Sequence, residues 1–396
     1  MKSEETKSGF WQTFVIWFGL GAMMFGTYCG GAMVSGTYAT GYFARFGGGY
    51  MLNYLLIFIV IMGLSCILGL NFIRCYKVKN YNEYYLAMYG LQDPNSNKFL
   101  RSAVTLFFDA YTTFNGILSA GATVALLANL FVNVFGIPYN AAGLVVVAIF
   151  GFLSINGAGF LRKFNTAMTL TLLICMILML IQVFQLRGDI YFNMLGNYEI
   201  GRDWTGDSVA SGYKLIVVYC MTTTVWGSIL SNYTQKVRDQ RDAIGSGIVI
   251  ALLCALLFFM TCSIVLPFLP EYLTNGTPIL SICKDHLNPF LTIVYYIMVV
   301  FAACSTGPTF TYNIANRFAE LWKSETVSRK TRVTIITFGF LLLCYLIALL
   351  GLMFIVQKGY ALLGAIAGFA VGIPLVISAF RVYAKDKRDA QAAKNA

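Results

Sequence analysis

Six glycines interrupt the first long apolar segment of the chain, where a simple membrane anchor would carry leucine and isoleucine. They are Gly21, Gly26, Gly30, Gly31, Gly36 and Gly41, with Thr27, Ser35, Thr37 and Thr40 between them. Each interior glycine weakens a helix by about 1 kcal/mol relative to alanine. Non-helical backbone at membrane depth occurs where it lines a protein-enclosed or water-filled cavity, and its free N–H and carbonyl groups can bind a carboxylate and a cation. The alternative is that these small residues serve close helix packing.

A second polar interruption occurs in the apolar segment from Ala210 to Thr234. Its middle carries hydroxyl, amide, glycine and tryptophan side chains: Thr222, Thr223, Thr224, Trp226, Gly227, Ser228, Ser231 and Asn232. The pattern predicts a second broken helix, with hydroxyls and carbonyls that could bind an amine. A polar helix that bonds to its neighbours within the bundle is the alternative.

Hydroxyl groups and a proline also meet near the centre of the segment Pro289–Phe318. Ser305 and Thr306 come directly before Gly307 and Pro308, and Thr309 follows. Proline removes a backbone donor and frees a carbonyl upstream. Carbonyl and hydroxyl oxygens suit a small hard cation such as sodium. A proline kink satisfied by its own hydroxyls would give the same pattern.

Asp109 is the one acid well inside a predicted span. A carboxylate within the membrane is costly, so a functional role in binding a proton or a cation is the default. It could instead form a structural pair with Arg162 or Lys163. No acid-base partner is close in sequence, and the chain contains no G-x-S-x-G, H-E-x-x-H or phosphate-binding motif. We therefore expect neither an enzyme nor an ATP-driven pump.

The elements that position these groups follow from composition. The 396 residues are 58% hydrophobic and only 11% charged, as expected for an all-α polytopic membrane protein. A bilayer core needs about 20 helical residues per crossing, and about ten segments qualify. They are Trp11–Phe43, Gly49–Tyr76, Leu100–Phe131, Pro138–Leu161, Phe164–Leu186, Ala210–Thr234, Ile244–Phe268, Pro289–Phe318, Val333–Val356 and Tyr360–Val382. The net charge of +11 is spread over short loops, so no nucleic-acid partner is indicated. The ten cysteines are interpreted as reduced packing residues.

Basic residues set the expected orientation. With the N-terminus inside, all but six of the 28 lysines and arginines fall on the cytoplasmic side, which satisfies the positive-inside rule. The six expected outside are Arg45, Arg187, Arg202, Lys214, Lys284 and Lys358. An even number of crossings places both termini in the cytoplasm. The N-terminus lacks the pattern of a cleaved signal peptide, so the first span is expected to be retained.

Two loops carry further signals. The inner loop Lys77–Lys98 contains YNEYYLAMYG, which predicts a short helix whose tyrosines lie in the headgroup layer. The outer stretch Pro270–Leu287 could be a partly helical cap over an entrance or an ordinary connection.

The layout of the segments suggests a single domain, 1–396, built from two repeats. Five spans occupy approximately 11–186 and five occupy 210–382. Because five is odd, the second set crosses the membrane in the opposite sense, which makes the repeat inverted. Such a repeat predicts breaks in both the first and the sixth spans.

The first span, GTYCGGAMVSGTYATGYFARFGG, resembles the signature of the YkvI-like transporters of bacteria. The third-span stretch ILSAGATVALLANLFVNVFGIP resembles the small-residue segment and Phe-Gly-Ile-Pro turn of the same family. The two matches cover about a quarter of the chain. Thr37 and Tyr38 depart from the pattern, which carries Gln-Glu there.

The resemblance implies the LeuT-type five-plus-five inverted repeat of the amino acid, polyamine and organocation superfamily, with breaks in helices 1 and 6. It places substrate between those breaks and a sodium-like site between spans one and eight. The substrate-binding residues would be Thr27, Tyr28, Gly30, Gly31, Ala32, Tyr111, Thr223, Trp226 and Gly227. The sodium-like site would take Tyr28, Gly31, Ser305 and Thr306. Some related carriers use a lysine of span five instead, but Lys163 lies near the membrane surface, so sodium is preferred over a proton.

The sequence thus predicts a secondary active transporter in the bacterial plasma (inner) membrane, with sodium as its only expected cofactor. Its partners would be the lipid bilayer and a small zwitterion, for which an amino acid is the preferred candidate. The competing hypothesis is a channel or passive pore for a small solute or ion, although the chain has no ring of charge or filter motif. Nothing in the sequence indicates an oligomeric state.

Overall fold

The computed structural model describes residues 2–28, 30–78, 80–155, 158–231 and 237–395; within these ranges, it describes only the backbone at 2–8, 10, 27, 31, 158–170, 389, 390 and 392–395. The α-helices in chain order are α1 (Lys2–Tyr28), α2 (Gly31–Val34), α3 (Gly47–Tyr76), α4 (Tyr81–Met88), α5 (Lys98–Phe135), α6 (Tyr139–Ile155), α7 (Ala158–Met194), α8 (Val209–Met221), α9 (Trp226–Leu230), α10 (Gln240–Val265), α11 (Pro278–Asp285), α12 (Pro289–Leu321), α13 (Arg329–Ala348), α14 (Leu352–Phe354), α15 (Tyr360–Ala367) and α16 (Ile373–Asn395). Short 3-10 stretches (η2, Thr222–Val225; η4, Leu266–Phe268) and π-helical stretches (η1, Ala39–Phe43; η5, Ile355–Gly359; η6, Gly368–Gly372) join some of them.

Eight helical segments in the described part of the chain are long and apolar enough to cross a membrane. They are Gly47–Tyr76, Lys98–Phe135, Thr171–Met194, Val209–Leu230, Gln240–Phe268, Pro289–Leu321, Arg329–Ala348 and Leu352–Arg388. Two shorter apolar helices, Trp11–Gly26 and Tyr139–Ile155, fall on the first and fourth predicted segments. The helix that contains the first of these, α1, breaks after Tyr28.

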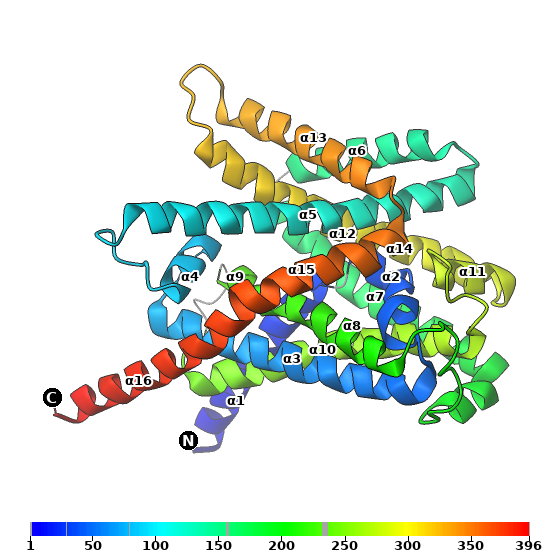
Figure 1. Ribbon diagram of the computed structural model, residues 1–396, viewed down its shortest axis with the longest axis horizontal. Coiled ribbons are helices and arrows are strands. Elements are labelled where there is room, and N and C mark those ends of the chain that lie inside the picture. The colour runs from blue at the N-terminus through cyan, green and yellow to red at the C-terminus, as the bar shows by residue number, and fades with distance from the viewer. Residues whose placement is uncertain (1, 29, 79, 156–157, 232–236, 396) are drawn as a thin grey trace.

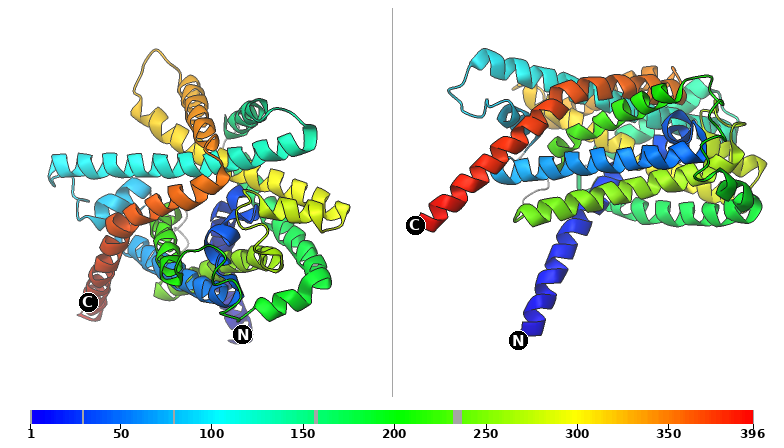
Figure 2. Two further views of the ribbon diagram at one scale, coloured as in Figure 1. Left: turned by 45° about the vertical axis from the view of Figure 1, so that its right-hand side comes forward. Right: turned by 60° about the horizontal axis from the view of Figure 1, so that its bottom comes forward.

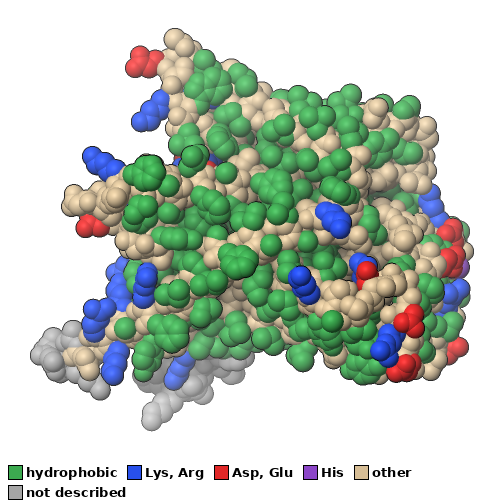
Figure 3. Space-filling view, viewed as in Figure 1, with side chains coloured by type: hydrophobic (Ala, Val, Ile, Leu, Met, Phe, Trp, Pro, Cys, Tyr) green, Lys and Arg blue, Asp and Glu red, His purple; other side chains and the backbone are tan. Residues whose placement is uncertain are grey.

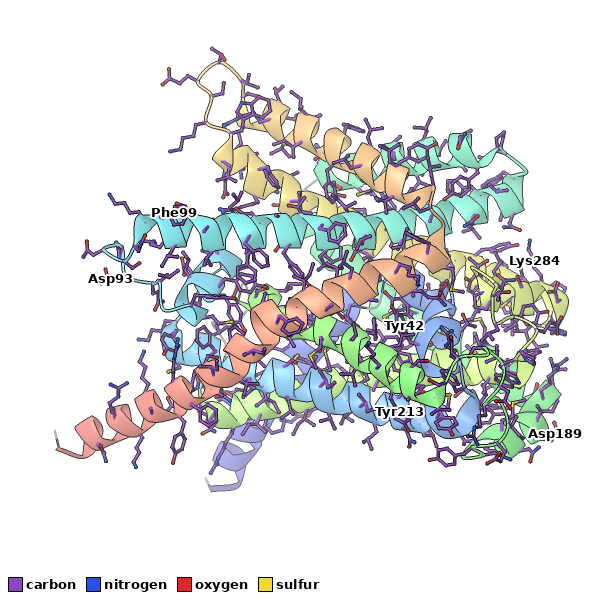
Figure 4. All side chains as sticks on the ribbon, in the orientation of Figure 1. Tyr42, Asp93, Phe99, Asp189, Tyr213 and Lys284 are labelled. Atoms are coloured by element: carbon purple, nitrogen blue, oxygen red, sulfur yellow. The ribbon has the colours of Figure 1, made fainter. Side chains whose placement is uncertain are left out.

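The long helices form one bundle, with most of them running along the same direction in Figure 1. The N-terminal part of α1 diverges from the rest in the right-hand view of Figure 2. Figure 4 places Asp93 and Phe99 at one end of the bundle and Asp189 and Lys284 at the opposite end. Loops predicted to face opposite sides of a membrane therefore lie at opposite ends of the molecule.

The Tyr-rich inner loop is helical as predicted, and two of its tyrosines are buried inside the protein. Tyr84 and Tyr85 of α4 are 0% and 1% exposed. Tyr85 stacks on Phe108 of α5 with ring centroids 3.5 Å apart, and its hydroxyl donates to Ser228 Oγ at 3.1 Å. Packing against α5 and α9 thus buries this face of the helix, whereas Tyr89, directly after it, is 40% exposed.

The boundary between the ninth and tenth spans also differs from the prediction. The helix α13 ends at Ala348, and Gly351, with a φ of +86°, turns the chain into α14. Lys358, predicted to lie in an outer loop, therefore lies inside the last span, in η5. A positive φ is readily adopted only by glycine, so this residue decides where the turn occurs.

Facing glycines bring the backbones of α3 and α9 into direct contact. A Cβ atom on Gly69 would come within 2.9 Å of the Gly227 Cα atom. A Cβ atom on Gly227 would come within 2.5 Å of the Tyr84 hydroxyl oxygen. Gly227, predicted to bind substrate, takes part in this helix contact, which we call the glycine seam.

The outer stretch Pro270–Leu287 forms a helix, α11, that packs on the interrupted first span. The Ile279 amide donates to the Ser35 carbonyl at 3.1 Å. The Thr37 hydroxyl donates to the Gly276 carbonyl at 2.9 Å. The stretch is therefore partly helical and is held against the first span.

Within α1, the Trp17 indole donates to Asp242 Oδ1 at 3.2 Å. The Arg238 guanidinium binds the same carboxylate at 2.8 Å. Trp17 packs where Gly245 has no side chain, since a Cβ atom there would overlap the indole ring. The inner half of α1 is thereby tied to the start of α10.

Of the nine described cysteines, all but Cys75 are both free and buried. The described residues also contain no cluster of three or more His, Cys, Asp or Glu side chains that could hold a metal ion.

Candidate functional site: a cavity between two interrupted helices

The break in the first span lies inside the bundle. The helix α1 ends at Tyr28, whose carbonyl accepts the Gly30 amide at 2.8 Å, and α2 starts at Gly31. Gly36 then takes a φ of +83°, and the chain continues as the π-helical η1. The glycine-rich sequence thus produces two changes of direction in a buried stretch.

The sixth span changes geometry at its three consecutive threonines. The hydroxyls of Thr222, Thr223 and Thr224 each donate to the carbonyl three residues earlier, at 2.7, 2.7 and 2.8 Å. Hydroxyls that bond back to the helix backbone compete with regular helix geometry, and here α8 tightens into the 3-10 stretch η2 before α9 begins. Both predicted interruptions are therefore present.

A cavity with about 50 Å³ of room for solvent lies between the two interruptions. Its walls come from the first span, α5, the sixth span, α12 and α15. The lining residues are Tyr28, Gly30, Ala32, Met33, Tyr38, Tyr111, Asn115, Ser119, Thr123, Tyr219, Thr222, Trp226, Thr306, Phe310 and Tyr360. None of these fifteen residues carries a charge.

Six residues predicted for the site line this cavity: Tyr28, Gly30, Ala32, Tyr111, Trp226 and Thr306. Two others lie apart from it. Thr223 is 0% exposed and its hydroxyl is bonded to the backbone, and Gly227 belongs to the glycine seam. At Thr27 and Gly31 the structure describes only the backbone.

On α5, sequence reasoning identified Tyr111 but missed the three polar residues that follow it on the same face. Asn115, Ser119 and Thr123 line the cavity at a spacing of four residues. Residues four apart share one face of a helix, so this polar stripe in an apolar helix was the signal that could have revealed them. The other lining residues not predicted for the site are Met33, Tyr38, Tyr219, Phe310 and Tyr360, whereas Thr222 belongs to the predicted sixth-span interruption.

The tyrosine hydroxyls around the cavity already have protein partners. The Tyr28 and Tyr219 hydroxyls are 2.8 Å apart. The Tyr360 hydroxyl lies 3.1 Å from Ser119 Oγ, and the Tyr111 hydroxyl donates to the Leu363 carbonyl at 3.2 Å. Hydrogen bonds of these tyrosines therefore connect α1 with α8 and α5 with α15 across the cavity wall.

Ser305 and Thr306 stand out because their hydroxyl oxygens are buried without a hydrogen-bond partner. Leaving a buried polar group unpaired costs about 1–3 kcal/mol. Thr306 lies against the break in the first span, since a Cβ atom on Gly30 would come within 2.9 Å of Thr306 Oγ1. The two predicted cation-binding hydroxyls are thus buried and unpaired, and that of Thr306 lies beside the first-span break. This donor set fits a hard cation.

Asp109 lies away from the cavity wall and is paired within the protein. Arg317 donates to both of its carboxylate oxygens, from Nε at 3.0 Å and from Nη2 at 2.8 Å. Tyr81 of α4 also donates to Oδ1. Burial, followed by the bond to Asp109, raises the pKa of Tyr81, so its hydroxyl stays a protonated donor. The alternative partners Arg162 and Lys163 lie among the side chains that the structure does not describe.

Comparison with solved structures identifies the fold. The inward-facing conformation of Mhp1 is similar with a TM-score of 0.61 and 14% identity, over 90% of this chain and 75% of that chain. A substrate-bound, outward-open Na⁺-coupled sialic acid symporter is similar with a TM-score of 0.52 and 15% identity, over 92% of this chain and 86% of that chain. The fold is therefore all-helical and LeuT-type, as predicted, and these neighbours are transporters rather than enzymes. No protein-family profile and no curated protein matches the sequence, so no family is assigned.

Proposed function

We propose that the chain is a secondary active transporter that moves a small zwitterionic solute of the amino-acid type across a membrane by alternating access, coupled to sodium. The observation that carries the proposal is the uncharged cavity between two interrupted helices, with the buried, unpaired hydroxyl of Thr306 in its wall and that of Ser305 on the preceding residue. If the solute site and the cation site both use the first-span break, binding of one can affect binding of the other through that shared segment.

The solute class follows from the cavity wall. A net charge in a low-dielectric site without counter-charge is costly, whereas a zwitterion has no net charge. In the proposed complex the carboxylate meets the backbone N–H groups of Gly30, Gly31 and Ala32. The cationic end lies toward Trp226 and the carbonyls of the sixth-span break. Thr222, which lines the cavity, takes the place there that the sequence assigned to Thr223.

The proposed sodium site uses carbonyl oxygens at Tyr28 and Gly31 together with the Ser305 and Thr306 hydroxyls. Oxygen ligands without formal charge are suited to a monovalent hard cation. A cation here would satisfy both unpaired hydroxyls. A proton is the competing coupling ion, and Asp109 would then be its candidate carrier.

The proposed orientation places both termini in the cytoplasm of a bacterial cell. Figure 3 shows lysine and arginine side chains gathered at the end of the molecule where the C-terminus lies, and acidic side chains concentrated at the opposite end. That asymmetry is what the positive-inside rule predicts for a bacterial plasma membrane.

The proposed transport cycle uses the two repeats, 11–186 and 210–382, within a single domain. Interruptions at Tyr28–Gly31 and at Thr222–Val225 occupy matching places in the two halves, which supports an inverted repeat. Rocking of α1, α3, α8–α9 and α10 against the remaining helices would expose the cavity to each side in turn.

The test is uptake and counterflow in proteoliposomes with a panel of labelled amino acids, with sodium or potassium outside. Thermal stability of the purified protein selects the solutes, because a ligand at 100 times its dissociation constant adds about 2.7 kcal/mol. Saturable, sodium-stimulated uptake with counterflow supports the proposal. Non-saturating conductance without counterflow would instead indicate a channel.

A further inference from the structure

The cavity wall offers aromatic rings rather than charges. Seven of its fifteen lining residues are Tyr, Trp or Phe, and none is acidic or basic. A cationic group is attracted to the face of an aromatic ring by the ring quadrupole, most strongly to tryptophan. The rings therefore offer a cation attractive faces that require no hydrogen bond.

The hydroxyls on those rings are largely engaged. Tyr28 is bonded to Tyr219, Tyr360 to Ser119, and Tyr111 to a carbonyl of α15. A primary ammonium group has three N–H donors that each need an acceptor. A quaternary ammonium group has none, so the rings can enclose it without any hydrogen bond.

Neighbouring rings in the wall are inclined to one another and do not lie parallel. Tyr28 and Trp226 have centroids 5.0 Å apart and an interplanar angle of 76°. Tyr38 meets Tyr219 and Tyr360 with interplanar angles of 54° in both cases. A flat aromatic solute needs parallel walls to stack between, whereas inclined rings enclose a compact, rounded group such as trimethylammonium.

We propose that the cationic end of the solute is an N-methylated ammonium group enclosed by this aromatic wall. The inference rests on the proposed transport function and narrows it from amino acids in general to their N-methylated, betaine-like derivatives. Trp226 and Phe310 on opposite spans, α9 and α12, provide two of the rings that enclose the methyl groups.

The experiment uses four solutes that share one carboxylate: glycine, N-methylglycine, N,N-dimethylglycine and N,N,N-trimethylglycine. Thermal stability and counterflow are measured for each in sodium buffer. Affinity is expected to rise with each methyl group, and 3,3-dimethylbutanoate, which replaces trimethylammonium by an uncharged tert-butyl group, is expected not to bind. Tightest binding by glycine, or equal binding of the tert-butyl analogue, would overturn the proposal.

Variants test the wall itself. Trp226→Leu and Phe310→Leu should each weaken trimethylglycine binding about tenfold, whereas Trp226→Phe, which keeps a ring, should retain most of it. Retention of the sodium-induced stability shift shows that each variant is folded. Unchanged affinity in folded Trp226→Leu and Phe310→Leu would contradict the aromatic wall.

The outcomes separate the two proposals. Sodium-stimulated transport of another amino acid, with no member of the methylated series bound, would overturn the methylated-ammonium inference and leave the transporter intact. Absence of binding and uptake for every solute, in sodium and in potassium, would overturn the proposed function and the inference with it.

Discussion

Thr306 packs directly against Gly30. A Cβ atom on Gly30 would lie 2.9 Å from both Oγ1 and Cγ2 of Thr306, closer than real Cβ atoms come to other heavy atoms. Two residues 276 positions apart in the sequence thus hold the first-span break against α12. The contact explains why this position has no side chain, and it joins the cavity wall to the candidate cation site.

Gly30→Ala should therefore disturb the break itself. We expect uptake to fall at least tenfold and stability to fall by about 1–3 kcal/mol, as is usual for overpacking a buried site. Gly339→Ala is the matched control, because Gly339 lies in α13 and the methyl group of an alanine there would have no neighbouring atom within 4 Å. Adding Thr306→Ser, which removes the Cγ2 methyl group, should restore part of the activity. Normal uptake by Gly30→Ala would show that the break tolerates a side chain.

Thr306→Val should separate protein stability from sodium binding. The Thr306 hydroxyl is buried and unpaired, so replacing it by a methyl group should cost nothing or stabilise the sodium-free protein by about 1 kcal/mol. The same change should abolish the additional stability conferred by sodium. Thr306→Ala should bind solute without turnover. A full sodium response in thermal unfolding of Thr306→Val would exclude this hydroxyl as a ligand.

Breaking the Asp109 pair should destabilise the junction of α5 and α12. Arg317 is 21% exposed, so Asp109→Asn should cost about 2 kcal/mol, less than a fully buried pair would. Adding Arg317→Gln should recover part of the loss, because it removes the unpaired charge. Thermal unfolding of the single and double variants measures this coupling. If Asp109 instead carries the coupling proton, Asp109→Asn should also remove the pH dependence of uptake.

Gly245→Ala should release the inner half of α1. A methyl group at residue 245 would occupy the space of the Trp17 indole, which then loses its bond to Asp242. We expect faster hydrogen exchange over residues 11–20, and Asp242→Asn should give a smaller change in the same direction. Exchange that rises equally throughout α10 and α13 would indicate general unfolding instead.

The two helix interruptions were predictable because they depend on local amino-acid composition. Glycines crowd the first apolar segment, and three threonines with Trp226 interrupt the sixth. Helix propensity and side-chain bonding to the backbone act over a few residues, so a single sequence reveals them. The stripe Asn115, Ser119, Thr123 was equally local, and a search for polar residues four apart would have identified it.

Other features could not be derived this way because they depend on distant packing. Asp109 pairs with Arg317, 208 residues away, whereas the sequence offered Arg162 and Lys163 as candidate partners. Tyr38, Tyr219 and Tyr360 join one wall although tyrosines occur throughout the chain, so no local pattern distinguishes them from lipid-facing rings.

The glycine seam has a mechanical consequence. Because neither Gly69 nor Gly227 has a Cβ atom, the backbones of α3 and α9 approach closely. We expect α3 and α9 to move together, with the hinge at the 3-10 turn Thr222–Val225. A shift of α3 would then displace Trp226, the first residue of α9, which lines the cavity.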